Sequence, residues 1–99
     1  MAVLELSSFE MIEKVDHPGS YQCVLSFGDN YELSIISGDG AYGTETAPYE
    51  IAVLKNDYFT HLPGITDEDD SVTGYLTESD VDAIIKKMYL ITGKTPVQI

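Results

Sequence analysis

Three groups of residues have types and spacings that could carry chemistry. The first is an acidic segment in which Asp67, Asp69, Ser71 and Glu78 match the oxygen-ligand positions 1, 3, 5 and 12 of an EF-hand loop. That loop needs a glycine at position 6, where this chain has Val72, and it needs a preceding amphipathic helix. We therefore predict a solvated acidic loop that leads into a capped helix, without a dedicated metal site.

The second group is the glycine-rich segment Gly38–Gly43, which matches G-x-G-x-x-G after a predicted strand. A dinucleotide site also requires a helix that opens at the third glycine, so that backbone amides meet the pyrophosphate. The following residues, Thr44–Pro48, are not a helix pattern, and no lysine or arginine lies between Lys14 and Lys55. We favour a connecting loop with Tyr42 at its tip, a common location for functional residues.

The third group comprises the isolated side chains Cys23, His17 and His61. One cysteine and two distant histidines are too few for a zinc site unless carboxylates are recruited from elsewhere. Serine, cysteine and histidine also show no local arrangement for nucleophilic catalysis. The sequence therefore predicts a protein that is not an enzyme and that holds no cofactor.

The charge of the chain indicates what it binds. Its 99 residues include 17 Asp and Glu but only 5 Lys and Arg, which gives a formal net charge of −12. Such a charge attracts cationic partners, and it disfavours direct binding to nucleic acid, which requires clustered lysine and arginine. Because 43% of the residues are apolar, we expect the carboxylates to lie on the surface of one folded domain, residues 1–99.

The chain also lacks the sequence signals of membrane insertion and export. No apolar run approaches the ~20 residues of a membrane span, and Met1–Glu5 has neither the basic nor the apolar region of a signal peptide. A single cysteine excludes an internal disulfide. These features favour the cytoplasm and no membrane partner.

Residues 78–91 have the pattern of an α-helix. Thr77 and Asp80 form a variant of the capping box, and Gly93 suits the left-handed position after the last turn. The positions i, i+3, i+4 and i+7 form one apolar face, made of Val81, Ile84, Ile85 and Met88.

The middle of the chain has the pattern of strands. Residues 21–27, 31–37 and 49–55 alternate apolar and polar side chains, and Gly28-Asp29-Asn30 is typical of a tight hairpin turn. Residues 58–62 and 72–76 are weaker strand candidates. The predicted fold is α+β: a small antiparallel β-meander of about four strands with the C-terminal helix packed on one face.

The first 18 residues fit two patterns. Ser7 with Glu10 indicates a short capped helix, whereas Phe9, Met11 and Val15 alternate as they would in a strand. We favour a short N-terminal helix.

Five segments between Tyr31 and Val81 also carry a family resemblance: Tyr31–Ile36, Tyr42-Gly43, Tyr49–Leu54, Ile65–Asp67 and Gly74–Val81. Together they cover about half of the chain, and they resemble small accessory proteins encoded by tailed bacteriophages. The resemblance implies the order strand, glycine loop, strand, acidic turn, strand and helix. It also implies expression in a bacterial host, where small acidic phage proteins often disable a host factor.

We therefore interpret the chain as a non-enzymatic phage-type accessory protein that binds a basic surface of a host protein. It would act as a nucleic-acid mimic or as an inhibitor of a host defence or DNA-binding factor. Tyrosine is the expected anchor, because the chain has seven tyrosines and no tryptophan and aromatic residues are enriched at interfaces. The predicted partner-binding residues are Asp67, Glu68, Asp69, Asp70, Glu78, Asp82, Tyr42 and Tyr75.

Two other interpretations remain open. The chain could bind a small ligand or a divalent cation with the 38–43 glycine loop or the 67–78 acidic loop. It could also be a structural phage protein that forms a homo-oligomer.

Overall fold

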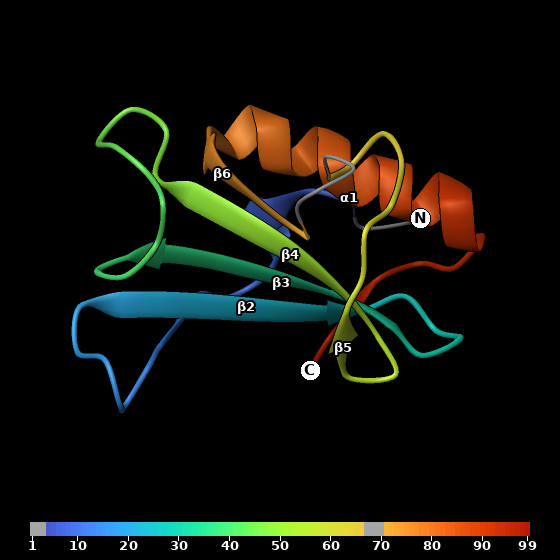
Figure 1. The fold of residues 1–99 in the computed structure, drawn as a ribbon, viewed down its shortest axis with the longest axis horizontal. Helices are drawn as coiled ribbons and strands as arrows, with labels where there is room; N and C mark the ends of the chain where they lie inside the picture. The colour runs from blue at the N-terminus through green and yellow to red at the C-terminus, as the bar shows by residue number, and fades with distance from the viewer. Residues whose placement is uncertain (1–3, 67–70) are drawn as a thin grey trace.

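The computed structural model describes residues 4–66 and 71–99, in which one antiparallel sheet carries one α-helix on one side (Figure 1). The strands are β1 (Ile12–Glu13), β2 (Ser20–Ser26), β3 (Tyr31–Gly38), β4 (Tyr49–Lys55), β5 (Tyr58–Phe59), β6 (Val72–Leu76) and β7 (Val97–Gln98). The helices are the short 3-10 helix η1 (Leu6–Ser8) and α1 (Glu78–Thr92). The predicted α+β class is confirmed, and the sheet is larger than the predicted meander.

The predicted meander forms the centre of this sheet, where β2, β3 and β4 pair in sequence order. The turn between β2 and β3 uses positive φ angles at Gly28 (77°), Asp29 (50°) and Asn30 (66°). These values are those that a tight hairpin turn requires. The Tyr31 amide donates to the Gly28 carbonyl at 2.9 Å, so the predicted hairpin is confirmed.

Short strands complete the sheet at both sides of the meander. At one side, β1 and β7 both pair with β2, and at the other side β5 and β6 both pair with β4. The side chain of Gln98 joins the two segments beside β2: its Nε2 donates to the Glu10 carbonyl at 2.6 Å, and its Oε1 accepts from the Glu10 amide at 2.9 Å. Strands of two residues have no detectable periodicity, so the sequence did not predict β1 or β7.

Helix α1 begins and ends as predicted. The Asp80 amide donates to Thr77 Oγ1 at 3.1 Å, and the Thr77 amide donates to Asp80 Oδ2 at 2.9 Å, which completes the capping box. Gly93 has a φ of 69° and its amide donates to the Tyr89 carbonyl at 2.7 Å. The buried residues of α1 are the predicted face, Val81, Ile84, Ile85 and Met88. No helix of the described residues is long and apolar enough to span a bilayer.

The N-terminal segment differs from the helix that we favoured. Its helical part is the single 3-10 turn Leu6–Ser8, which has no side-chain cap, and Ile12–Glu13 pairs as a strand with β2. Leu6 is buried in the core with the apolar face of α1. Burial of Leu6 and pairing with β2 thus replace the amphipathic helix that Ser7 and Glu10 indicated.

The sheet has one covered face and one open face. Its covered face joins Cys23, Leu25, Phe27, Leu33, Ile35, Ile51 and Val53 to the buried residues of α1 in a single core. Side chains alternate between the two faces along a strand. The strand residues that alternate with these core residues therefore point to the opposite face of the sheet. The residues paired with them on neighbouring strands point to that face as well. This second face, called the open face below, consists of Ile12, Gln22, Val24, Ser26, Glu32, Ser34, Ile36, Glu50, Ala52, Leu54, Phe59, Val72 and Val97. Of these, Glu50 and Ala52 are buried.

Candidate functional site

Two of the predicted partner-binding residues, Tyr42 and Tyr75, lie together in the structure. The backbone amide of Tyr75 donates a hydrogen bond to the Tyr42 carbonyl at 2.8 Å, which joins the β3–β4 loop to β6. Tyr42 is 64% exposed and Tyr75 is 61% exposed. The backbones are therefore fixed to one another while both side chains remain accessible to a partner.

Gly74 makes this close approach possible. A Cβ atom at position 74 would lie 2.6 Å from the Tyr42 Cβ and 2.7 Å from the Tyr42 carbonyl oxygen, which only a residue without a side chain avoids. The pairing of β4 with β6 is irregular between Tyr49 and Ile51. The glycine that weakened the strand pattern is thus the point at which the loop docks on β6.

The backbone of Tyr75 is strained. Its φ is +56°, a left-handed conformation that costs a residue with a side chain about 1–2 kcal/mol. The other non-glycine residues with positive φ are Asn and Asp in turns, which adopt this conformation more readily. Strain of this kind is concentrated at functional sites.

A buried carboxylate, that of Glu50, holds the backbone of Tyr42 in place. Glu50, in β4, is only 8% exposed, and its Oε1 accepts a hydrogen bond from the Tyr42 amide at 3.0 Å. The alternation predicted for residues 49–55 sets Glu50 on the opposite side of the strand from Tyr49, Ile51 and Val53, and it gives no sign that Glu50 is buried. Sequence reasoning missed this role, because the loop that covers Glu50 cannot be inferred from its spacing.

The predicted acidic residues Glu78 and Asp82 lie beside Tyr49. Burial first, and then the charges of Glu78 and Asp82, raise the pKa of the Tyr49 hydroxyl above its ordinary value. Glu78 is exposed at the first position of α1. Asp82 is half-buried, and its Oδ1 accepts from the Leu6 amide at 2.8 Å. Asp82 therefore has a structural role as well, since it ties the N-terminal segment to α1.

The remaining predicted residues, Asp67, Glu68, Asp69 and Asp70, lie outside the described residues. Within residues 4–66 and 71–99, no group of three or more His, Cys, Asp and Glu side chains could hold a metal ion.

The isolated side chains His61 and Cys23 both lie in local structural environments. His61 Nδ1 lies 3.0 Å from Thr66 Oγ1. Cys23 is buried, which raises the pKa of its thiol.

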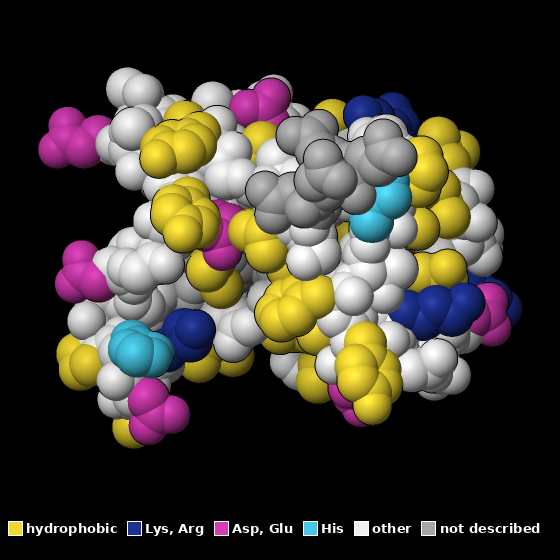
Figure 2. All heavy atoms as spheres, in the orientation of Figure 1, with side chains coloured by type: hydrophobic (Ala, Val, Ile, Leu, Met, Phe, Trp, Pro, Cys, Tyr) yellow, Lys and Arg dark blue, Asp and Glu magenta, His cyan; other side chains and the backbone are white. Residues whose placement is uncertain are grey.

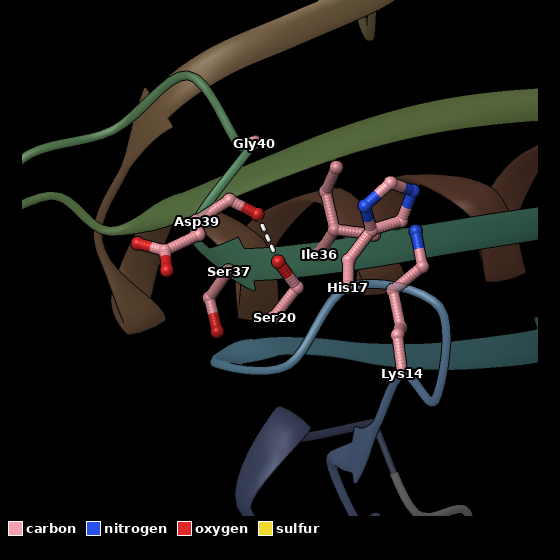
Figure 3. Close-up of a pocket in the computed structure, with 7 residues that line it drawn as sticks. All are labelled: Lys14, His17, Ser20, Ile36, Ser37, Asp39 and Gly40. Atoms are coloured by element: carbon pink, nitrogen blue, oxygen red, sulfur yellow. Dashed lines mark hydrogen bonds between the residues drawn. The ribbon is translucent and has the colours of Figure 1, made fainter.

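A cavity of about 210 Å³ lies where the glycine-rich segment begins (Figure 3). It is lined by Lys14, His17, Ser20, Ile36, Ser37, Asp39 and Gly40. The hydroxyl of Ser20, the first residue of β2, donates to the carbonyl of Asp39, which directly follows β3. Lys14 and His17, which looked unrelated in sequence, both extend toward the part of the cavity next to Ile36 (Figure 3).

This cavity is not a dinucleotide site. The residues after Gly43 form a hydrogen-bonded loop, in which the Thr44 amide donates to the Ala47 carbonyl at 2.9 Å, and no helix opens there. Its volume is also below the roughly 300–1,000 Å³ of typical small-molecule pockets. The cavity is better suited to a single side chain of a larger partner than to a nucleotide.

No protein-family model, curated protein or solved structure matches this chain.

Proposed function

We propose that the protein is a non-enzymatic binding protein that engages a cationic surface of another protein. The Tyr42–Tyr75 pair is the anchor, and Glu78, three residues after Tyr75, would supply negative charge at its rim. One observation carries the proposal: the hydrogen bond from the Tyr75 amide to the Tyr42 carbonyl fixes two exposed aromatic residues, at the cost of backbone strain at Tyr75. Ordered aromatic anchors with an acidic rim fit a protein interface.

Arginine and lysine are the side chains that such a surface selects. A cation is attracted to the face of a tyrosine ring, and this molecule already contains one such contact, because Lys55 Nζ lies 4.6 Å from the centroid of the Tyr31 ring. Carboxylates beside the ring add charge attraction that increases the association rate and weakens as salt is added.

The resemblance to phage accessory proteins supports a bacterial partner. We expect that partner to be a host protein with a basic surface, such as a DNA-binding factor. The carboxylate of Glu78 would occupy a position that receives phosphate groups, and the protein would act as an inhibitor. In this function the chain needs no cofactor and no contact with nucleic acid or membrane.

The proposal is tested by affinity capture from bacterial lysate with the immobilised chain. We expect wild type to capture a basic protein at low salt, and the double variant Tyr42→Ala, Tyr75→Ala to capture less of it by about tenfold. Tyr58→Ala is the matched control, because Tyr58 is 76% exposed on β5 and lies outside the pair. Equal capture by the double variant, or recovery of no basic protein at either low or moderate salt, contradicts the proposal.

A further inference from the structure

The open face of the sheet is more apolar than a solvent-facing sheet surface normally is. Antiparallel sheets with one solvated face usually alternate apolar and polar residues so that polar side chains meet water. Here most open-face positions are apolar, and three of them are well exposed: Ile12 (55%), Phe59 (65%) and Val97 (65%). Ile12 and Val97 lie on the two strands beside β2, whereas Phe59 lies beside β4. Apolar surface that is contiguous across a face is typical of an interaction site.

No described helix covers this face, since α1 packs on the other one. In the view of Figure 2, hydrophobic side chains gather over the region of β4 to β6, and Asp and Glu lie mainly near the outline of the molecule. The exposed residues Asp29, Asp39 and Asp57 lie in the turns at the strand ends. None of the open-face positions is lysine or arginine. The face thus carries apolar residues on β2 to β4 (Val24, Ile36, Ala52 and Leu54) and on the short outer strands, with polar residues between them. Its border carries Asp29, Asp39 and Asp57 together with Lys14 and Lys55.

Charge and strand pairing indicate which kind of molecule could bind the open face. A second copy carries the same net charge of −12, so like-charge repulsion opposes the docking of two copies through this face. Addition of a partner strand to β2 or β4 is also disfavoured, because β1 and β7 pair with β2, and β5 and β6 pair with β4. An occupant that docks on the face itself, with apolar contacts and positive charge at its sides, fits best.

We propose that the open face binds an amphipathic α-helix of the partner, with lysine and arginine along both sides of its apolar stripe. The stripe would lie on Val24, Ile36 and Leu54, and the cationic side chains would reach the aspartates of the border. The opposite face already accommodates such an element, because α1 covers it with apolar residues at i, i+3, i+4 and i+7. The cation Lys14 at one corner would favour the C-terminal end of the docked helix, where the helix dipole is negative.

This inference rests on the proposed function, and it adds the form of the ligand and the surface that receives it. The test is an NMR titration of the isotope-labelled full chain with two synthetic peptides of leucine and lysine. Both have the length of α1, 15 residues. One has leucine at the helical period, and its isomer has the same composition and charge in scrambled order. We expect the patterned peptide to bind roughly tenfold more tightly than its isomer and to shift the amide signals of Val24, Ile36 and Leu54.

Variants distinguish binding through the apolar residues of the open face from binding through charge alone. The double variant Ile36→Ser, Phe59→Ser should bind the patterned peptide about tenfold more weakly. Leu90→Ser, which changes a residue of α1 that is 72% exposed, should bind it as wild type does. If the double variant fails to fold, the amide signals that shift in the wild-type chain still show whether the patterned peptide binds the open face.

Each other outcome has a defined meaning. Equal binding of both peptides, with shifts confined to acidic residues, overturns the helix-docking inference but leaves the proposed function standing. Binding of neither peptide contradicts both proposals. Sedimentation equilibrium that shows a dimer abolished by Ile36→Ser, Phe59→Ser identifies the occupant as a second copy and also overturns the inference.

Discussion

The Glu50 carboxylate accepts a hydrogen bond from the Tyr42 amide at 3.0 Å, although only 8% of Glu50 is exposed. Tyr42 is thereby fixed from two sides, by Glu50 through its amide and by Tyr75 through its carbonyl. An exposed aromatic side chain on a fixed backbone loses less freedom on binding than one on a loose loop. The placement of the accessible Tyr42 ring therefore depends on the buried side chain of Glu50.

Replacing Glu50 tests this dependence. We expect Glu50→Ala to lower the free energy of unfolding by about 1 kcal/mol, because the Tyr42 amide loses its acceptor. Hydrogen exchange at the Tyr42 amide should become faster. Glu50→Gln keeps an acceptor oxygen and should retain most of the protection. Equal exchange rates at Tyr42 in wild type and Glu50→Ala would show that the hydrogen bond does not order the loop.

The strain at Tyr75 predicts opposite effects on stability and binding. Tyr75→Gly removes the steric cost of a positive φ, and we expect urea denaturation to show a free energy of unfolding higher by roughly 1 kcal/mol. Binding of the cationic partner should weaken, because the ring is lost. Tyr75→Ala removes the same ring and keeps a Cβ, so it should show weaker binding without the gain in stability. A gain of equal size in both variants would rule out backbone strain as its cause.

The capping box of α1 predicts a pH dependence of stability. Hydrogen bonds from the Thr77 backbone and side chain lower the pKa of the Asp80 carboxyl below its ordinary value of 3.8. Asp80 therefore stabilises the fold above pH 3.8, and this contribution is lost as the pH falls through the lowered pKa. Thermal melts should show a smaller loss of stability over this acid range in Asp80→Asn than in wild type.

Removal of the Thr77 hydroxyl, the second side chain of the capping box, should lower stability at neutral pH. Thr77→Ala should lower the free energy of unfolding by about 1 kcal/mol, whereas Thr77→Ser keeps the acceptor and should cost less. Identical stability of these two variants would indicate that the hydroxyl does not cap α1.

Tyr49 reports on the charges beside the candidate site. Its raised pKa means that the folded state favours the neutral hydroxyl, so this contribution to stability is fully present below pH 10.0 and is lost as the pH rises through the raised pKa. Glu78→Gln with Asp82→Asn should lower the pKa of Tyr49 toward 10.0, and burial should keep it above that value. NMR of labelled tyrosine measures this directly. An unchanged titration would show that these carboxylates lie too far from Tyr49 to act on it.

The elements that the sequence predicted well are those set by local periodicity and capping. The apolar stripe of Val81 and Ile85 and the box of Thr77 and Asp80 depend on residues within a few positions of one another, and all occur in the structure. Gly28 to Asn30 likewise predicted the hairpin from turn chemistry alone. Such signals are complete within one segment of the chain, so no tertiary information is needed to read them.

The features that escaped prediction depend on contacts between distant segments. Ser7 and Glu10 have the spacing of a helix cap, but burial of Leu6 and pairing of Ile12 with Gln22 outweigh this local preference. The sequence identifies Tyr42 and Tyr75 only as two separate tyrosines, and nothing in their positions predicts the hydrogen bond between their backbones. The role of Glu50 was hidden for the same reason, since its cover comes from a loop that follows a different strand.

The short outer strands have a further consequence for how the protein behaves at high concentration. A free strand edge is a template for the growth of fibrils, and natural proteins protect such edges with short or irregular strands. Here β1, β5 and β7 have two residues each, and β6 is irregular where Tyr42 contacts it. Few backbone groups in register are left on β1, β5 and β7 to seed a cross-β stack. The exposed apolar side chains of the open face are therefore not flanked by long free strands along which fibrils could grow.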